Sequence, residues 1–440
     1  MESSDRPRFA LPVITDHQKT RLCSFADQGF QGLANLGVNA LLARSLIKND
    51  FASVGLLLGV YFFILGLHRS NVTVPFILDT GRPGADGSKD ADAWWWFNLG
   101  FLILAALVLW AVSAIARVVV PPDSVWVARA LDYAPVVAPA LCLTEFGRRW
   151  LYYAGKPVVA ATAAGLYFII NVLVASIVLL TGAGLALGVS AWVLAAAGYM
   201  TVVVWAAPPL AVHPRQVAAV WKPHAQFAGW QMLTHLPYAI YNNSVVLLIG
   251  FFGGPIAAAI FTAARTLSSP ILSVGAAVDL LDKPRAALAL ATQGVAGLKR
   301  SIARTRRLLL LANGSYLLLV LLATRPMLEL AFGDRYLGHE LEVQILAVGF
   351  FLFGLNQPSE TLLIILRSSR VLLLTRCVAA VSAVVALAIL SRLYGAAGCA
   401  AAIVCVQLVN IVGLRMAESY ATRQAEAGLP ADGPPHEAAA

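Results

Sequence analysis

One long segment of the chain is apolar without a break and reads Phe101-Leu-Ile-Leu-Ala-Ala-Leu-Val-Leu-Trp-Ala-Val112. It shows none of the polar–apolar alternation that a membrane-spanning β-strand carries over about ten residues. The apolar block around it is long enough for the ~20-residue helix that crosses a bilayer. A helix also satisfies its own backbone hydrogen bonds in lipid, whereas an open sheet would leave its edges unpaired. We therefore predict a transmembrane helix here.

The same pattern recurs along the whole chain of 440 residues, of which 59% are hydrophobic and only 12% charged. The mean hydropathy is +0.75, and soluble domains usually carry about 25% charged residues. We predict an all-α, polytopic membrane protein of about 12 transmembrane helices. The expected spans cover residues 24–46, 51–67, 94–117, 130–148, 157–181, 186–208, 226–251, 255–278, 307–324, 341–366, 371–391 and 396–416.

The basic residues predict the orientation of these spans, because loops rich in Lys and Arg stay on the cytoplasmic side. With the amino terminus inside, only seven of the 32 Lys and Arg residues lie on the outer side, namely Arg44, Lys48, Arg117, Arg129, Arg325, Arg335 and Arg392. We expect both termini in the cytoplasm and a multi-pass protein of the bacterial inner membrane. The net charge of +9 then reflects loops held against anionic lipids, and we expect no nucleic-acid partner.

Motifs that carry chemistry are sparse in this sequence. The five cysteines lie in or beside apolar segments without CxxC or Cys/His spacing, so we expect reduced packing residues and no metal or other cofactor. Walker A, HExxH and GxSxG sequences do not occur. Because the loops are also too short for a catalytic domain, we expect a protein that is not an enzyme.

Two predicted helices carry a polar face. On the first span, four amides step by three, four and four residues, which places them on one side of a helix. They are Gln28, Gln31, Asn35 and Asn39, with Asp27 at the shoulder. The seventh span repeats the design with Gln231, His235, Tyr238 and Asn242. The two faces lie about half a chain apart, as expected for two six-helix repeats with a substrate path between them.

These polar faces have two interpretations. Amides in membranes often hydrogen-bond neighbouring helices and so hold a bundle together. Because two matched faces exceed what packing needs, we favour a polar cavity lined by these nine residues. The ionisable residues Glu145, Arg265 and Glu360 also lie inside spans, where a charge must be paired, hydrated or functional. Glu145 can pair with Arg148 and Arg149 on one helix face.

Two surface features have simpler explanations. The triplet Trp94–Trp96 opens an apolar run after a polar loop, and indoles prefer the level of the lipid headgroups. We therefore interpret it as an interface anchor. The basic segment 299–307 could lie on the cytoplasmic leaflet and attract anionic headgroups. The rule that loops rich in Lys and Arg stay inside would alone produce such a cluster, and we favour that explanation.

Several motifs recur in known proteins. In the first half they are Phe25-Ala-Asp-Gln-Gly29, Asn39-Ala-Leu-Leu-Ala-Arg44 and Gly66-Leu-His68-Arg69. In the second half they are Phe251-Phe-Gly-Gly254 and Ile260-Phe-Thr-Ala-Ala-Arg265. Together they resemble the polysaccharide flippases (Wzx-like) of the multidrug/oligosaccharidyl-lipid/polysaccharide (MATE/MOP) exporter superfamily. The sequence departs from the superfamily's lipid II flippases, which usually carry two further helices.

This resemblance implies two six-helix lobes around a central cavity that opens to one side at a time. It also implies a flippase that moves an undecaprenyl-pyrophosphate-linked oligosaccharide from the cytoplasmic to the periplasmic leaflet, for extracellular or surface polysaccharide biosynthesis. Arg44 and Arg265 match positions of the family. With Glu145 and Glu360 they become candidates for headgroup binding or ion coupling.

Two other functions stay open. A cation-coupled exporter of small organic cations would need acidic residues in its cavity, and this chain offers few and is basic. A membrane-embedded glycan polymerase would need a large outer loop. The longest candidates, near 117–130 and 325–341, are short. Both alternatives are therefore less favoured than the flippase.

The expected organisation has five parts: a cytoplasmic N-tail (1–23), an N-terminal six-helix lobe (24–210), a cytoplasmic linker (211–225), a C-terminal six-helix lobe (226–416) and a disordered cytoplasmic tail (417–440). The expected partners are the lipid-linked oligosaccharide and membrane lipids. A polysaccharide polymerase and chain-length proteins are candidate protein partners.

Overall fold

The computed structural model of the chain describes residues 16–80, 87–243, 245–366 and 368–427. All regular secondary structure in these residues is helical, as the uninterrupted apolar runs predict. The elements are α1 (Asp16–Ser45), α2 (Lys48–His68), the π-helix η1 (Arg69–Thr73), α3 (Val74–Thr80), α4 (Gly87–Val119), η2 (Pro122–Ser124), α5 (Val125–Tyr153), α6 (Pro157–Thr181), α7 (Leu185–Ala206), α8 (Pro214–Trp221), η3 (Lys222–His224), α9 (Ala225–Tyr238), the π-helix η4 (Ala239–Asn243), α10 (Val245–Leu267), α11 (Ser269–Phe332), η5 (Gly333–Tyr336), α12 (Glu340–Ile365) and α13 (Ser369–Glu426).

Nine helical runs in the described part are long and apolar enough to cross a membrane. Three of them hold 54, 52 and 58 residues. At 1.5 Å per residue a straight helix of such a length would extend about 80 Å, far beyond the ~30 Å hydrocarbon core. The three runs are interrupted at Gly254, Gly294 and Gly395, each with a positive φ. Glycine adopts this conformation at little cost, and the 52-residue run is also interrupted at Ala323. The long runs therefore divide into shorter crossings.

The helix α1 is not among these nine runs, because its polar face lowers its hydropathy. With α1 and the divided runs, the chain folds as the predicted all-α, polytopic bundle, and this fold class is confirmed. The predicted end of the last helix is wrong. α13 continues to Glu426, where Lys299 Nζ lies 2.6 Å from its carboxylate, so residues 417–426 are helical rather than disordered. Residues 1–15 and 428–440 of the expected tails lie outside the described residues.

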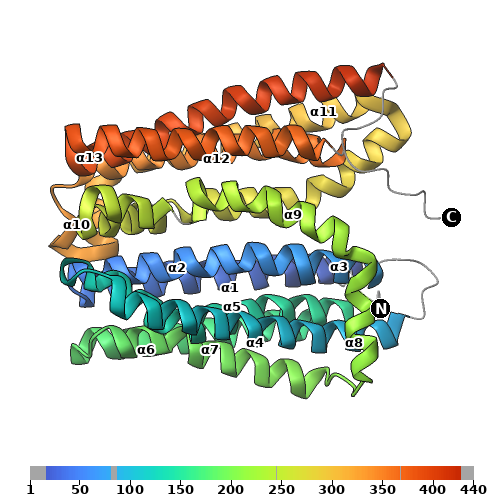
Figure 1. The fold of residues 1–440 in the computed structure, drawn as a ribbon, viewed down its shortest axis with the longest axis horizontal. Coiled ribbons are helices and arrows are strands. Elements are labelled where there is room, and N and C mark those ends of the chain that lie inside the picture. Colours follow the sequence, from blue (N-terminus) through green and yellow to red (C-terminus); the bar gives the residue numbers. More distant parts are fainter. Residues whose placement is uncertain (1–15, 81–86, 244, 367, 428–440) are drawn as a thin grey trace, which may run out of the picture.

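The helices form two lobes that lie side by side (Figure 1). The N-terminal lobe comprises α1–α7, coloured blue to green, and the C-terminal lobe comprises α9–α13, coloured yellow-green to red. We call the end of the bundle where α1 begins and α13 ends the proximal end. The distal end is the opposite one, where α1 turns into α2. The helix α8 runs across the proximal end between the lobes (Figure 1).

The segment that joins the lobes is held against the proximal end of α4. Trp94 Nε1 donates to Asp79 at 2.9 Å, and His224 Nε2 lies 2.8 Å from the same carboxylate. Trp96 Nε1 donates to the Leu210 carbonyl at 2.9 Å. The interpretation of Trp94–Trp96 as headgroup anchors is therefore wrong for the first two indoles, since Trp94 and Trp95 are buried and only Trp96 is exposed. The partners that bury them come from distant segments.

The lobes approach each other closely where α2 meets the second lobe. A Cβ on Gly55 would collide with the Thr262 side chain of α10, and a Cβ on Gly66 would collide with the imidazole of His235. Small residues allow such close approach between membrane helices, where packing rather than the hydrophobic effect drives association. The contact between the lobes therefore depends on these glycines.

Replacing Gly55 with alanine should destabilise the protein by about 1–3 kcal/mol, because the added methyl group overpacks the contact with Thr262. Thermal unfolding in detergent measures the effect. Gly100 of α4 is the matched control, since an added methyl group there would meet nothing within 4 Å and alanine is favoured over glycine in helices. Equal thermal shifts for Gly55→Ala and Gly100→Ala would contradict this account of the contact.

Candidate functional site: a polar cavity between the lobes

A cavity of about 570 Å³ lies between the lobes. It receives side chains from α1, α2 and α5 on one side and from α9, α10 and α13 on the other. All eight residues of the two polar faces line it: Gln28, Gln31, Asn35, Asn39, Gln231, His235, Tyr238 and Asn242. The structure thus brings together two faces that are half a chain apart in sequence.

The hydrogen bonds of α1 separate the two interpretations of its amides. Gln31 Nε2 donates to Asp27 at 3.2 Å and Asn39 Nδ2 donates to the Asn35 carbonyl at 2.8 Å, both within α1 itself. None of the hydrogen bonds in the described residues joins an amide side chain of this face to another helix. These amides therefore do not hold neighbouring helices together. Gln28 and Asn35 leave both side-chain polar groups free for the cavity, whereas the side-chain oxygen of Asn39 is buried without a partner in the described residues.

The opposite face is anchored at one point. His235 Nε2 lies 3.3 Å from the Phe63 carbonyl of α2, and its ring packs near the rings of Phe63 and Tyr238. The π-helix η4 begins two residues after Pro237 and carries Asn242, which lines the cavity. Wider turns of this kind often occur at functional sites. The π-helix η1, which follows α2, begins with Arg69, which also lines the cavity.

Three arginines contribute positive charge to the cavity wall: Arg69, Arg265 and Arg376. Arg376 Nη2 bonds Glu360 at 2.7 Å, and its Nη1 donates to the Thr234 carbonyl at 3.2 Å. Glu360 itself is not part of the lining. Glu360, which the sequence suggested for headgroup binding or ion coupling, instead neutralises the charge of Arg376 from outside the cavity lining.

Arg265 differs from the other two arginines. Its guanidinium lies 4.5 Å from the ring centroid of Phe62, across the contact between the lobes. Within the described residues no carboxylate pairs with it. The face of an aromatic ring attracts a cation but leaves its hydrogen-bond donors free. Arg265 therefore presents an uncompensated charge to whatever occupies the cavity.

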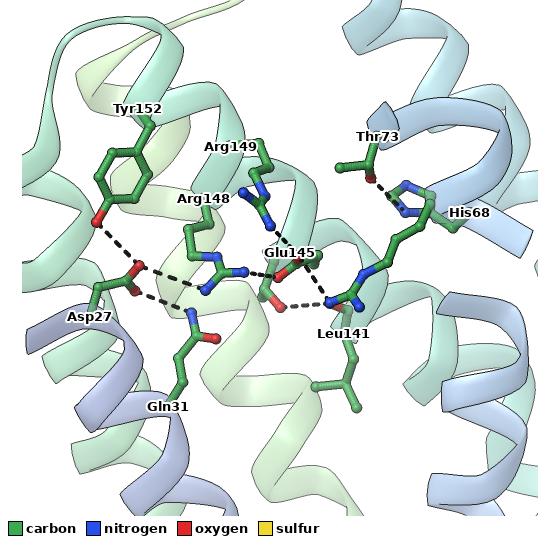
Figure 2. Close-up of polar contacts among 11 residues, drawn as sticks. Asp27, Gln31, His68, Thr73, Leu141, Glu145, Arg148, Arg149 and Tyr152 are labelled. Carbon is green, nitrogen blue, oxygen red and sulfur yellow. Dashed lines mark hydrogen bonds and ion pairs between the residues drawn. The ribbon is translucent and has the colours of Figure 1, made fainter. Parts of the chain in front are cut away.

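A network of charges connects the cavity wall to the interior of the N-terminal lobe (Figure 2). Glu145 of α5 pairs with Arg148 at 2.5 Å, with Arg69 at 3.3 Å and with Arg149 at 3.4 Å. Arg148 also lies 3.9 Å from Asp27. Figure 2 shows Arg148 between the two carboxylates. Glu145 and Arg69 line the cavity, whereas Arg148 is buried behind them.

Besides Glu360, two further predicted site residues do not line the cavity. Asp27 is fully buried and accepts hydrogen bonds from Gln31 and, at 3.4 Å, from Tyr152, so its expected place on the substrate path is wrong. Arg44 lies at the distal end and donates to backbone carbonyls of α11. Its donors are therefore engaged at this end of the bundle and not in the cavity. Both residues satisfy their charges with groups from distant helices.

Sequence reasoning missed two of the three cavity arginines. Arg69 stands in one of the family-like motifs, and this is its only signal. Arg376 lies near the start of the predicted span 371–391. When the Lys and Arg residues are divided between the two sides of the membrane, it is counted with the cytoplasmic loop before that span. Among the described residues, no group of three His, Cys, Asp or Glu side chains could hold a metal ion.

Two helical lobes around a polar cavity with a charged wall are the architecture of membrane transporters, whose substrate paths run between their repeats. The sequence matches the profile of a family described as polysaccharide biosynthesis proteins over residues 41–338. The chain belongs to this family. No curated protein matches it.

Solved structures of the MATE/MOP superfamily share the fold. An inward-facing MATE family multidrug resistance transporter aligns with a TM-score of 0.70 at 17% identity, covering 89% of this chain and 96% of that one. An outward-facing form aligns with a TM-score of 0.60 at 16% identity, covering 93% and 96%. The lipid II flippase MurJ, in an inward closed conformation, aligns with a TM-score of 0.66 at 10% identity, covering 92% and 90%.

Proposed function

We propose that this protein flips an undecaprenyl-pyrophosphate-linked oligosaccharide from the cytoplasmic to the periplasmic leaflet by alternating access. The glycan and the pyrophosphate cross through the cavity while the lipid chain stays in the membrane. Membership in a polysaccharide biosynthesis family and a fold shared with a lipid II flippase support this function.

The observation that carries the proposal is Arg265. Its guanidinium points into a cavity between two lobes and has no carboxylate partner in the described residues. Guanidinium groups bind phosphate oxygens with two parallel hydrogen bonds. A pyrophosphate between Arg265, Arg69 and Arg376 would supply the missing negative charge. The same positive wall disfavours the export of small organic cations.

The amides of α1 supply the second part of the site. Sugar hydroxyls both donate and accept hydrogen bonds, and side-chain amides offer both kinds of group. Gln28 and Asn35 line the cavity without using their side-chain amides elsewhere in the described residues. We therefore assign the glycan to the α1 wall and the pyrophosphate to the arginines.

The orientation follows from the distribution of charge. The proximal end carries most of the Lys and Arg residues, so we propose that it faces the cytoplasm, with both termini inside and the lobes divided near residues 211–225. The chain then lies in the bacterial inner membrane as a transporter without an enzymatic activity of its own. A polymerase and chain-length proteins would act on the flipped product.

Deletion of the gene tests the function. Lipid-linked glycan should accumulate in the cytoplasmic leaflet, and the surface polysaccharide should disappear. Complementation with the intact chain should restore both. Normal delivery of the polysaccharide to the surface in the deletion strain would reject the proposal.

Replacing Asn35 with alanine should lower transport per folded molecule several-fold, because its side chain faces the cavity and holds no other helix. Asn171→Ala is the matched control. Asn171 is also an asparagine within a helix, but it is buried, bonds the Tyr167 carbonyl of its own helix and does not line the cavity. Complementation of the deletion strain, normalised to the amount of protein in the membrane, measures both. If the two variants transport equally well, the amides of α1 do not contact the substrate.

A further inference from the structure

An arginine from the N-terminal lobe covers the end of a helix in the C-terminal lobe. Arg44, in the last turn of α1, donates from Nε to the Ala331 carbonyl at 3.0 Å and from Nη2 to the Glu329 carbonyl at 3.2 Å. Its Nη2 also bonds the Leu330 carbonyl. These carbonyls belong to the last turn of α11, which ends at Phe332. The last carbonyls of a helix generally lack partners within the helix and form its negative pole, although the Glu329 carbonyl here also accepts from the Gly333 N–H.

The C-terminal lobe makes the reciprocal contact with the N-terminal lobe. Arg335 lies just beyond the end of α11 and bonds the Leu46 carbonyl, which lies just beyond the end of α1. Lys48 supports the pair, since its Nζ lies 3.5 Å from His339 Nε2. The buried ring of Tyr336 packs against Phe51, with the ring centroids 6.0 Å apart. Each lobe thus covers the end of a helix of the other lobe with an arginine.

Ion pairs near the proximal end have a different arrangement. Arg148 pairs with Glu145 inside the N-terminal lobe, and Arg306 pairs with Glu418 inside the C-terminal lobe. These pairs hold each lobe together and do not join the two. The arginines at the distal end join the lobes, and their acceptors are neutral carbonyls rather than carboxylates.

The choice of acceptor makes the contact reversible. Separating an arginine from a buried carboxylate leaves an uncompensated charge on both sides, which is strongly unfavourable. Separating it from the end of a helix leaves a carbonyl that water can satisfy and a guanidinium that is already partly solvated, since Arg335 is exposed. A contact of this kind holds a closed state without preventing its opening.

We propose that Arg44 and Arg335 form a reciprocal latch that closes the distal side of the cavity and opens once in every transport cycle. The role in the cycle rests on the proposed function, whereas the closure itself does not. Loss of both arginines should favour the state in which the lobes separate at the distal end.

Distance measurements between spin labels test the latch. The labels sit on Thr181→Cys, at the distal end of α6, and Leu393→Cys, near the distal turn of α13, in a chain whose five native cysteines are replaced by alanine. Both positions are exposed and lie in different lobes. In the double variant Arg44→Gln, Arg335→Gln, the ratio of long to short distances should rise roughly 5- to 30-fold over the parent, the change that one or two kcal/mol produces.

Two further variants make the outcome decisive. Arg117→Gln removes a distal arginine that pairs with Asp132 inside the N-terminal lobe at 2.8 Å, and its distances should match those of the parent. Arg44→Lys keeps the charge but lacks the fork that reaches several carbonyls, so it should give an intermediate ratio. If the double variant is poorly folded, the ratio of long to short distances in Arg44→Lys is compared with that of the parent instead. Distances equal to those of the parent would overturn the latch.

The distances between the spin labels are measured without any substrate. The latch and the proposed flippase function can therefore be rejected independently of each other. A protein whose distances respond to the arginines but which moves no lipid-linked glycan retains the latch and loses the proposed function. A protein that moves the glycan but shows unchanged distances retains the function and loses the latch.

Discussion

Replacing Arg265 with glutamate should abolish transport while leaving the protein in the membrane at nearly its normal level. The substituted carboxylate would repel the pyrophosphate at the point where the uncompensated guanidinium now lies. Removing one partner of a desolvated charge pair costs about 2–5 kcal/mol, so we expect a loss of at least about 30-fold in transport rate. Complementation of the deletion strain and transport in vesicles measure the loss.

Two variants accompany this test. Arg265→Lys keeps the charge but binds phosphate at a single point, so it should retain part of the activity. Arg325→Glu makes the same change of charge at an exposed position outside the cavity and should transport normally. Normal transport by Arg265→Glu would exclude a headgroup contact at this residue.

Replacing Arg148 with methionine should destabilise the N-terminal lobe by about 3–5 kcal/mol, the cost of breaking a buried ion pair by removing one partner. Arg148 lies between Glu145 and Asp27, and all three side chains are buried (Figure 2). Glu145 keeps Arg69 and Arg149, whereas Asp27 loses the one cation that lies within ion-pair distance of it in the described residues. Thermal unfolding of the purified protein in detergent measures the change.

The remaining charge on Asp27 provides the control. Adding Asp27→Asn to Arg148→Met should recover part of the stability, because the carboxylate left without a partner is then neutral. Arg129 pairs with Asp50 at 2.6 Å but is half-exposed, so Arg129→Met should cost no more than about 1 kcal/mol. Strictly additive effects of Arg148→Met and Asp27→Asn would contradict the coupling between these two residues.

The spacing of polar residues along the chain predicted the cavity, because this spacing alone decides which residues share one face of a helix. Residues three and four apart share a face of any helix, and a polar face in lipid must meet another helix or water. These two facts placed Gln28 to Asn39 and Gln231 to Asn242 on the cavity wall without knowledge of how the lobes pack. The apolar runs predicted the helices for the same reason.

Periodicity could not predict contacts that other helices decide. Asp27 lies close to the polar face of α1, yet Arg148 and Tyr152 of α5 take it into the lobe interior. Arg44 carries a motif of the family, yet its donors go to the end of α11, almost 290 residues away. Trp94 has the position of a headgroup anchor, but Asp79 and His224 surround it. Such partners come from tertiary packing.

Transport by the purified protein in lipid vesicles tests the role of the cavity most directly. The vesicles contain a fluorescent lipid-pyrophosphate-linked sugar, and a membrane-impermeant reductant quenches only the molecules in the outer leaflet. With the intact chain, quenching should extend beyond the half of the lipid that is initially exposed, whereas vesicles with Arg265→Glu should stop at that half. If the intact chain leaves the inner pool as protected as it is in vesicles without protein, this cavity does not carry the lipid-linked glycan.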